Sequence, residues 1–324
     1  MKHAICLFAT AVLATAAAAS NAAARADDYP VSPVRIVVPY AAGGGGDIIA
    51  RMLGARLGEK WAQPVVTDNR PGAGTVIGTD LVAKAQPTGY TLLVNTAAIT
   101  INPGLLKKLP YDTLKDLVPV TQIAVLPNLL VVNPSLAVNS VKDLLDLAKK
   151  SSGLTYGSSG TGTVAHLAGE LFRATAGIHL THVPYKGGSA LMPDLMAGRL
   201  QLTFATIPSS IAFVKSGKLK ALAVASGRRS PTLPEVPTIA EAALPGFDAS
   251  NWIGLFVPAK TPKRIADFLQ LEIAALVKER EFSEKMLTLG FEPAATTPAE
   301  FSKVISAEVI KWKRVIEASG ATSE

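Results

Sequence analysis

The chain has 324 residues, of which 32 are Lys or Arg and 25 are Asp or Glu, and its formal net charge is +7. Its basic residues are scattered, with no run of five and no interleaved aromatic residues, which favours a solvated basic surface and argues against nucleic-acid binding. The single cysteine, Cys6, lies in an N-terminal segment that we expect to be removed on export. The mature chain would then have no thiol for a disulfide, a metal site or nucleophilic catalysis.

The first 26 residues have the pattern of a signal peptide. Lys2 and His3 form a short polar start, 4–19 is an Ala-rich apolar run, and 24–26 (Ala-Arg-Ala) matches the small-x-small cleavage pattern. A membrane-spanning helix needs about 20 strongly apolar residues, and this run is shorter and mostly Ala. We therefore expect export and a mature chain that begins at Asp27.

The next part of the chain alternates strand and helix patterns. We expect strands near 34–39, 64–67, 90–95 and 118–124, and helices near 47–60, 74–85 and 113–116. The stretch 96–111 contains Pro103 and Pro110 and is expected to be an irregular loop.

A similar series follows in the second half. We expect strands near 129–132, 154–156, 179–184, 200–205 and 219–225, and a helix over 141–150 with Ser140 as its N-cap. The last part predicts a strand over 252–257 and helices near 262–278, 283–289 and 298–317.

These elements form an internal repeat. A β-loop-α-β-loop-α-β unit that starts at Arg35 recurs from Leu154, which predicts two similar lobes. In each half a further strand follows the fourth one, and we expect 129–132 and 252–257 to cross between the lobes. The predicted divisions are 27–125 for lobe 1, 126–248 for lobe 2 and 249–324 for the return to lobe 1.

The predicted fold class is therefore α/β, with two lobes that each contain a mostly parallel sheet flanked by helices. Two crossing strands form a hinge, and we expect the lobes to close about it when a ligand binds.

The first repeat unit contains a run of four glycines, 43–46, between a strand and a helix. Because glycine costs backbone entropy, such a run predicts that the backbone approaches another group closely, with a flexible surface turn as the alternative. Bare N–H groups at the start of a helix are suited to anions. We expect Gly44 to need a small side chain or a positive φ, and Asp47 to cap the helix rather than touch a ligand.

The matching loop of the second unit, 158–163, combines glycines with the hydroxyls of Ser158, Ser159, Thr161 and Thr163. Hydroxyl and N–H groups can satisfy a carboxylate without a buried countercharge. His166 follows in the first helical turn, where it could contact a ligand or brace the loop.

Other motifs are incomplete. The stretches 72–78 and 160–165 resemble dinucleotide-binding fingerprints, but the strands that follow them end without an acidic residue for the ribose. The stretch 157–161 has Thr161 where a nucleophile elbow requires glycine. A Ser-His-acid triad that includes Ser159 and His166 is conceivable but unsupported. His179 and His182 lack an acidic cluster for a metal.

The chain resembles the Bug-type periplasmic solute-binding proteins of the tripartite tricarboxylate transporter system. The resemblance covers nearly all of 30–322, with the motifs in the family's order. The matching stretches are 36–51 (IVVPYAAGGGGDIIAR), 68–78 (DNRPGAGTVIG), 87–95 (PTGYTLLVN), 101–112 (INPGLLKKLPYD), 156–167 (YGSSGTGTVAHL), 183–188 (VPYKGG) and 252–262 (WIGLFVPAKTP).

The resemblance implies a type II periplasmic-binding fold, also called a Venus flytrap, that delivers a carboxylated solute to a membrane permease. It implies ligand contacts from both glycine loops, with two strand ends lining the sides. The residues so implied are Tyr40, Ala42, Gly43, Gly44, Thr96, Ala97, Ser159, Gly160, Thr161, Gly162, Thr163, Thr206 and Ile207, to which His166 is added from its position.

The sequence departs from the family pattern at two places, the first loop, which has four glycines, and Ala205-Thr206, where an acidic residue or Asn is common. Both departures concern the identity of the ligand. We expect a monomer without cofactor, metal or catalysis that works in the periplasm. The alternatives are an exported serine hydrolase that uses Ser159 and His166, and a ligand-sensing subunit for a membrane receptor.

Overall fold

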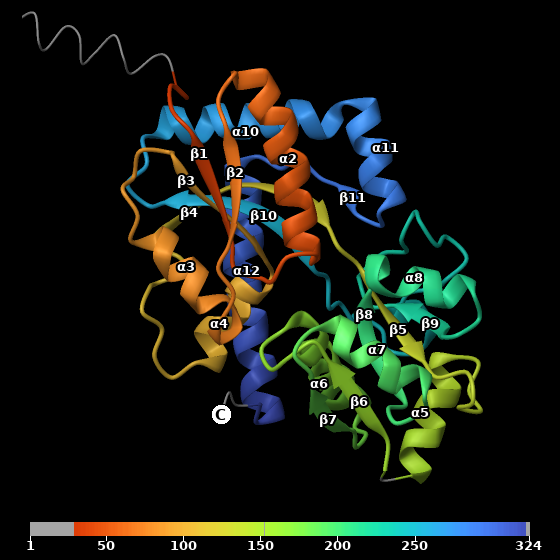
Figure 1. Cartoon of the computed structure of the whole chain (residues 1–324). Helices are drawn as coiled ribbons and strands as arrows, with labels where there is room; N and C mark the ends of the chain where they lie inside the picture. The colour runs from red at the N-terminus through yellow and green to blue at the C-terminus, as the bar shows by residue number, and fades with distance from the viewer. Residues whose placement is uncertain (1–28, 152, 322–324) are drawn as a thin grey trace, which may run out of the picture.

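The computed structural model describes residues 29–151 and 153–321 and shows two lobes joined by crossing strands (Figure 1). The predicted signal peptide, 1–26, lies outside the described residues. Among the helices of the described part, none combines the length and the apolar character needed to cross a membrane.

Lobe 1 is built on a six-stranded sheet with the order β11-β4-β10-β3-β1-β2. Its strands are β1 (Val34–Val38), β2 (Val65–Asn69), β3 (Thr91–Thr96), β4 (Leu117–Val125), β10 (Trp252–Pro258) and β11 (Glu292–Pro293). Its helices are α2 (Gly45–Trp61), the short 3-10 helix η1 (Ala73–Thr75), α3 (Val76–Ala83), α4 (Ala98–Leu105), α10 (Lys263–Lys278), α11 (Arg280–Thr288) and α12 (Pro298–Ser319).

Lobe 2 is built on a five-stranded sheet with the order β7-β6-β8-β5-β9. Its strands are β5 (Asn128–Val132), β6 (Thr155–Ser158), β7 (Thr181–Pro184), β8 (Leu202–Thr206) and β9 (Lys220–Val224). Its helices are α5 (Val141–Lys150), α6 (Val164–Ala176), α7 (Gly188–Met196), α8 (Ile207–Lys215) and α9 (Ile239–Ala242).

The predicted crossing strands are confirmed. β5 follows β4 along the chain but pairs in the sheet of lobe 2, and β10 follows β9 but pairs in the sheet of lobe 1. In each sheet the strand that comes from the other lobe lies between the third and the fourth strand of the repeat. The two sheets therefore share one order, β2-β1-β3-β10-β4 in lobe 1 and β7-β6-β8-β5-β9 in lobe 2.

The prediction that the sheets are mostly parallel is wrong in one respect. The first three strands of each repeat pair in parallel, but β10 runs antiparallel to β3 and β4, and β5 runs antiparallel to β8 and β9. A helical crossover sets a strand parallel to its neighbour, whereas a strand that enters from the other lobe arrives from the opposite end of the sheet. Each sheet is therefore mixed.

Two local predictions in lobe 1 also fail. The segment 96–111, expected to be irregular, contains α4, even though Pro103 lies inside that helix. Pro103 has no N–H to donate to the carbonyl of Ile99, and the hydroxyl of Thr113 donates to that carbonyl instead, at 3.3 Å. Residues 113–116, expected to be helical, form a turn in which the carboxylate of Asp112 accepts two backbone N–H groups.

Local signals mark the ends of two of the predicted helices, α5 and α12. Ser140 caps α5 as expected, since its Oγ accepts the N–H of Asp143. Thr297 and Glu300 form a capping box at the start of α12, and Gly320 ends that helix in the left-handed region.

Helix α12 connects the lobes in addition to the two crossing strands. It starts behind the sheet of lobe 1 and extends to the side of α6 in lobe 2 (Figure 1). One continuous apolar cluster accordingly includes Phe301 and Trp312 from α12 and Phe172 from α6, all fully buried. The hinge therefore consists of two strands and a helix that contacts both lobes.

The crossing strand β10 passes close to α12 at Gly254. A Cβ at that position would lie 2.2 Å from the ring of Phe301. We predict that Gly254→Ala destabilises the protein by about 1–3 kcal/mol, the range for overpacking a well-filled core, as measured by chemical denaturation. Gly153→Ala is the control, because a Cβ on Gly153 meets no atom within 4 Å. Equal stability of the two variants would contradict the packing described.

Candidate functional site

The first glycine loop connects β1 to α2. The N-cap of α2 is Gly44, and its first turn has no side-chain cap. The first N–H groups of a helix have no intrahelical acceptor, so the turn of Gly45 and Gly46 presents bare donors at the positive end of the helix dipole. This is an arrangement that binds anions.

Asp47 fixes the shape of this loop. Its carboxylate accepts the N–H of Gly43 at 2.8 Å, Nδ2 of Asn69 at 3.0 Å and Nε of Arg51 at 3.0 Å. Burial alone would raise the pKa of Asp47, but the hydrogen bonds from Arg51, Gly43 and Asn69 outweigh it and hold the pKa below its usual value. Arg51 is therefore paired with Asp47. Asp47 holds the loop but does not cap the helix as expected, because the N–H that it accepts belongs to Gly43, which precedes the N-cap Gly44.

Of the two alternatives expected for Gly44, the positive φ is not found. Its φ is −79°, which any residue can adopt, and a Cβ there would come no closer than 3.6 Å to the carbonyl of Ala41. The positive φ in this loop belongs to Gly43, at +86°. Gly43 therefore provides the left-handed turn that aligns its N–H with Asp47.

Tyr40 links the loop to the end of β3. Its hydroxyl lies 2.6 Å from Oγ1 of Thr96 and donates to Oδ1 of Asn95 at 3.1 Å. Asn95 is fully buried and donates in turn to Thr79 at 3.0 Å. The structure thus brings together two of the residues implied by the resemblance, Tyr40 and Thr96. The buried side-chain amide of Asn95 holds the Tyr40 hydroxyl in this position.

The second glycine loop connects β6 to α6 and divides its hydroxyls into two groups. Ser158 bonds to Gly160 and His182, and Thr163 donates to the carbonyl of Gly160 at 2.7 Å while capping α6. Within the described residues, the hydroxyls of Ser159 and Thr161 have no hydrogen-bond partner and are not fully buried. These two hydroxyls are available to a ligand, whereas the other two hold the loop in shape.

His166 braces the second loop. Its Nδ1 accepts the N–H of Gly162 at 3.2 Å, and its ring stacks on that of His182 with centroids 4.0 Å apart. The ring of Tyr156 stacks on the other side of the pair, 4.9 Å from His182. An imidazole engaged in this way is not positioned as a base for Ser159, and the serine that does contact a histidine is Ser158.

Both imidazoles are neutral at pH 7. Burial lowers the pKa of His166, and burial together with the nearby His166 lowers the pKa of His182 to about 4. The loop thus provides hydroxyl and N–H donors without a formal positive charge.

The two lobes approach closely at Gly162. A Cβ on this residue would lie 2.7 Å from Cδ2 of Leu105, which is the last residue of α4 in lobe 1, and its φ is +80°. Glycine is therefore required at this position both by conformation and by space. On the hinge side, Arg228 of lobe 2 donates to the buried Glu292 of lobe 1 at 2.8 Å.

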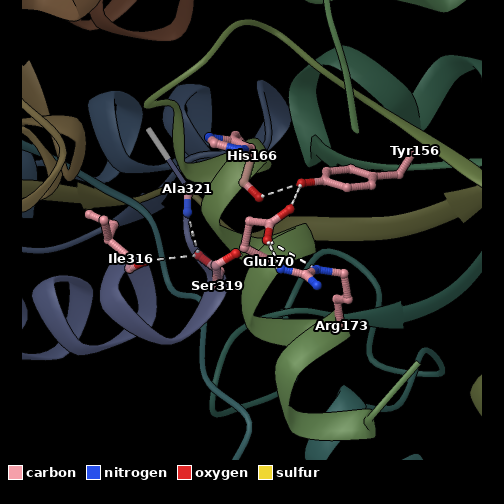
Figure 2. A network of polar contacts seen from close by, with 7 residues as sticks. All are labelled: Tyr156, His166, Glu170, Arg173, Ile316, Ser319 and Ala321. Carbon is pink, nitrogen blue, oxygen red and sulfur yellow. Dashed lines mark hydrogen bonds and ion pairs between the residues drawn. The ribbon is translucent and has the colours of Figure 1, made fainter. Parts of the chain in front are cut away.

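A polar network ties α6 to the end of α12 (Figure 2). The buried carboxylate of Glu170 accepts the hydroxyl of Tyr156 at 2.6 Å and two N–H groups of Arg173 at 3.1 and 2.7 Å. The same guanidinium donates to the carbonyl of Ser319 at 2.9 Å. The helix whose N-terminus carries the second loop is thereby fixed to lobe 1.

The remaining residues implied by the resemblance differ in their surroundings. Ala97 and Ile207 are fully buried, and the N–H of Ile207 is donated to the carbonyl of Pro127. Ala42 is exposed at the tip of the first loop. Thr206 is the N-cap residue of α8, but its hydroxyl makes no cap to the backbone and lies 2.9 Å from that of Ser209. The side chains of Ala97 and Ile207 are apolar and buried, so they offer a ligand no polar contact.

Sequence reasoning missed Asn69 and Asn95, which hold the first loop and its neighbour in place. Each is the last or nearly the last residue of a parallel strand, and polar residues at such strand ends were the signal available in the sequence.

The fold and the loops define a class of protein, a two-lobed receptor that binds a small solute between its lobes. Residues 49–321 match the family model described as the tripartite tricarboxylate transporter family receptor. The chain belongs to this family, whose members are receptors and not enzymes. The hydrolase alternative is therefore set aside.

Individual proteins that are similar to this chain support the same family. Protein BugT of Bordetella pertussis is 36% identical over 309 residues, which cover 94% of this chain and 95% of BugT. An R. palustris protein solved with adipate is 36% identical, has a TM-score of 0.84, and is matched over 91% of this chain and 99% of its own. MatC from Rhodopseudomonas palustris, solved with malate, is 28% identical, has a TM-score of 0.80, and is matched over 89% and 100%.

The neutral histidines predict how stability depends on pH. His182 has a pKa of about 4 in the folded protein and about 6.5 in an unfolded chain, so between these values the unfolded state binds more protons. Stability should therefore be fully present above pH 6.5 and should fall as the pH drops toward 4. Melting temperatures of the wild type and of His182→Gln, compared over pH 4–8, test this. The melting temperature of the variant should fall less than that of the wild type between pH 6.5 and pH 4. The same pH profile in both proteins would contradict the lowered pKa of His182.

Proposed function

We propose that this protein captures a small organic carboxylate in the periplasm and delivers it to the membrane permease of a tripartite transporter. The observation that carries the proposal is the pair of glycine loops, one in each lobe, that present unpaired N–H and hydroxyl donors at the starts of α2 and α6. The adipate and malate held by two similar proteins support the same class of ligand.

We also propose how the chain is exported, how it divides into lobes and in which oligomeric state it acts. Residues 1–26 direct export, and the mature chain divides into 27–125, 126–248 and 249–324 as lobe 1, lobe 2 and the return to lobe 1. It acts as a monomer. The carboxylate is held by Gly44 and the first turn of α2 on one side and by Ser159 and Thr161 on the other. Gly43 and Gly160, whose N–H groups are bonded within the loops, shape the site together with Thr163 and His166.

A carboxylate screen tests the proposal. Binding to the folded state alone stabilises a protein by about 2.7 kcal/mol at 100 times its Kd, which a thermal-shift assay detects. Thr161→Val, which removes an unpartnered hydroxyl, should weaken binding of a hit by about 5- to 150-fold, corresponding to about 1–3 kcal/mol. Thr163→Val should mainly lower the melting temperature, because its hydroxyl is used within the loop. A library without any hit, or unchanged affinity in Thr161→Val, would count against the site.

The two-lobed arrangement predicts closure. A ligand that bridges both loops favours the closed state by its differential affinity for that state, so the radius of gyration measured by X-ray scattering should fall on saturation. Trp252 starts the return strand and donates to the buried Glu308 at 2.9 Å, so its fluorescence should respond.

The tryptophan controls follow from the structure. Trp61 is the last residue of α2 and donates to Glu272 of α10, also in lobe 1, so it serves as the silent control. Trp312 lies on α12, which contacts lobe 2, so Trp312→Phe is needed beside Trp252→Phe. Tight binding with an unchanged radius would show that the site is rigid and preformed.

A further inference from the structure

Asn128 is a buried polar residue whose side chain has no partner. It is the first residue of β5, the strand that brings the chain into lobe 2, and only 1% of its surface is exposed. Within the described part of the chain, neither its Oδ1 nor its Nδ2 has a hydrogen-bond partner. Other described residues with an unpartnered buried side-chain atom have one such atom, whereas both polar atoms of Asn128 lack a partner.

An orphaned amide is unfavourable. Leaving a buried donor or acceptor without a partner costs about 1–3 kcal/mol, and folded proteins pair the great majority of such groups. A leucine of similar size would avoid the cost at a position flanked by Leu129 and Leu130. The amide is therefore explained best by a partner that the folded chain itself does not supply.

Asn128 lies on the face of the lobe 2 sheet that packs against α6, the helix that follows the second loop. It is directly opposite Thr206 in the antiparallel pair of β5 and β8, so the two side chains share one face. The next pairs on that face, Leu130 with Phe204 and Val132 with Leu202, belong to the apolar cluster that also contains residues of α6. Asn128 is thus at the polar end of a face that α6 covers.

The first loop is also near. Leu126, two residues before Asn128, lies 3.4 Å from the position of a Cβ on Gly45, in the first turn of α2. In β6 the register sets Gly157 beside Thr203, so the residues after Ser158 reach the level of Thr206 and Asn128. Asn128 therefore lies at the start of the crossing strand, two residues from a contact with the first turn of α2 and at the end of the lobe 2 sheet from which the second loop leaves.

The other end of the same strand provides a contrast. Asn133, directly after β5, is also buried, but its Nδ2 donates to the carbonyls of Leu195 and Met196 and its Oδ1 accepts from Ser135. An asparagine with a structural role on this strand is thus fully bonded.

We propose that Asn128 contacts the ligand and determines its class. Nδ2 donates to a carboxylate oxygen, and Oδ1 accepts from a hydroxyl or amino group on the carbon next to that carboxylate. The inference rests on the proposed carboxylate-binding function. Both glycine loops supply donors, so Oδ1 of Asn128 is an acceptor that a plain carboxylate leaves unpaired and a 2-hydroxy or 2-amino carboxylate satisfies.

The test is calorimetry on matched ligand pairs, malate against succinate and 2-hydroxyadipate against adipate. The wild type should prefer the hydroxylated member of the pair that it binds. Asn128→Leu should weaken that ligand by about 10- to 100-fold and remove the preference, while the melting temperature of the ligand-free protein stays the same or rises. Asn128→Asp, which places a carboxylate beside the ligand's own, should abolish binding.

Asn133→Leu is the matched control and should lower the melting temperature without changing the Kd. Asn128→Ala replaces Asn128→Leu if the larger side chain prevents folding. Affinity within twofold of the wild type in Asn128→Leu, or a wild type that prefers the plain acids, would overturn the inference while the carboxylate function stands. A wild type that binds none of the acids in these pairs or in the carboxylate library would overturn both.

Discussion

The exchange of one strand between the lobes is the constraint on which the rest of this structure depends. β5 completes the sheet of lobe 2 but follows β4 of lobe 1, and β10 does the reverse. Because each sheet contains a strand that arrives from the other half, the chain crosses between the lobes twice. The exchange also sets the start of β5 beside the end of β8, so the hinge and the polar end of the second sheet coincide.

The N–H and hydroxyl donors of the two glycine loops are available to a ligand because the charged and polar side chains beside them are bonded to one another or to the loop backbone. Asp47 takes the N–H of Gly43 and neutralises Arg51, and Thr163 caps α6 from within its own loop. Burial keeps the two imidazoles of lobe 2 uncharged. What remains exposed at these turns is a set of oriented dipoles held by a rigid surround, which costs little reorganisation when an anion arrives.

Much of the fold could be predicted from the sequence, because the repeat is visible in the glycine loops and in the strand patterns that flank them. The failures have physical causes. Helix α4 forms around Pro103 because Thr113, ten residues further on, bonds the carbonyl that proline leaves free. The antiparallel direction of β10 depends on the path between lobes, which no local pattern encodes. The orphaned amide of Asn128 is invisible in a sequence, since only the packed structure shows that nothing pairs with it.

The reliance on main-chain donors has a consequence for how such receptors diversify. Any substitution of an arginine deletes its guanidinium, but only a substitution to proline deletes a peptide N–H, so the capacity to hold an anion at the start of α2 survives most other substitutions that keep the turn intact. Variation at the surrounding side chains can then alter which molecule is preferred without first abolishing capture. A lineage built on this plan can pass from one nutrient to another through intermediates that still bind something.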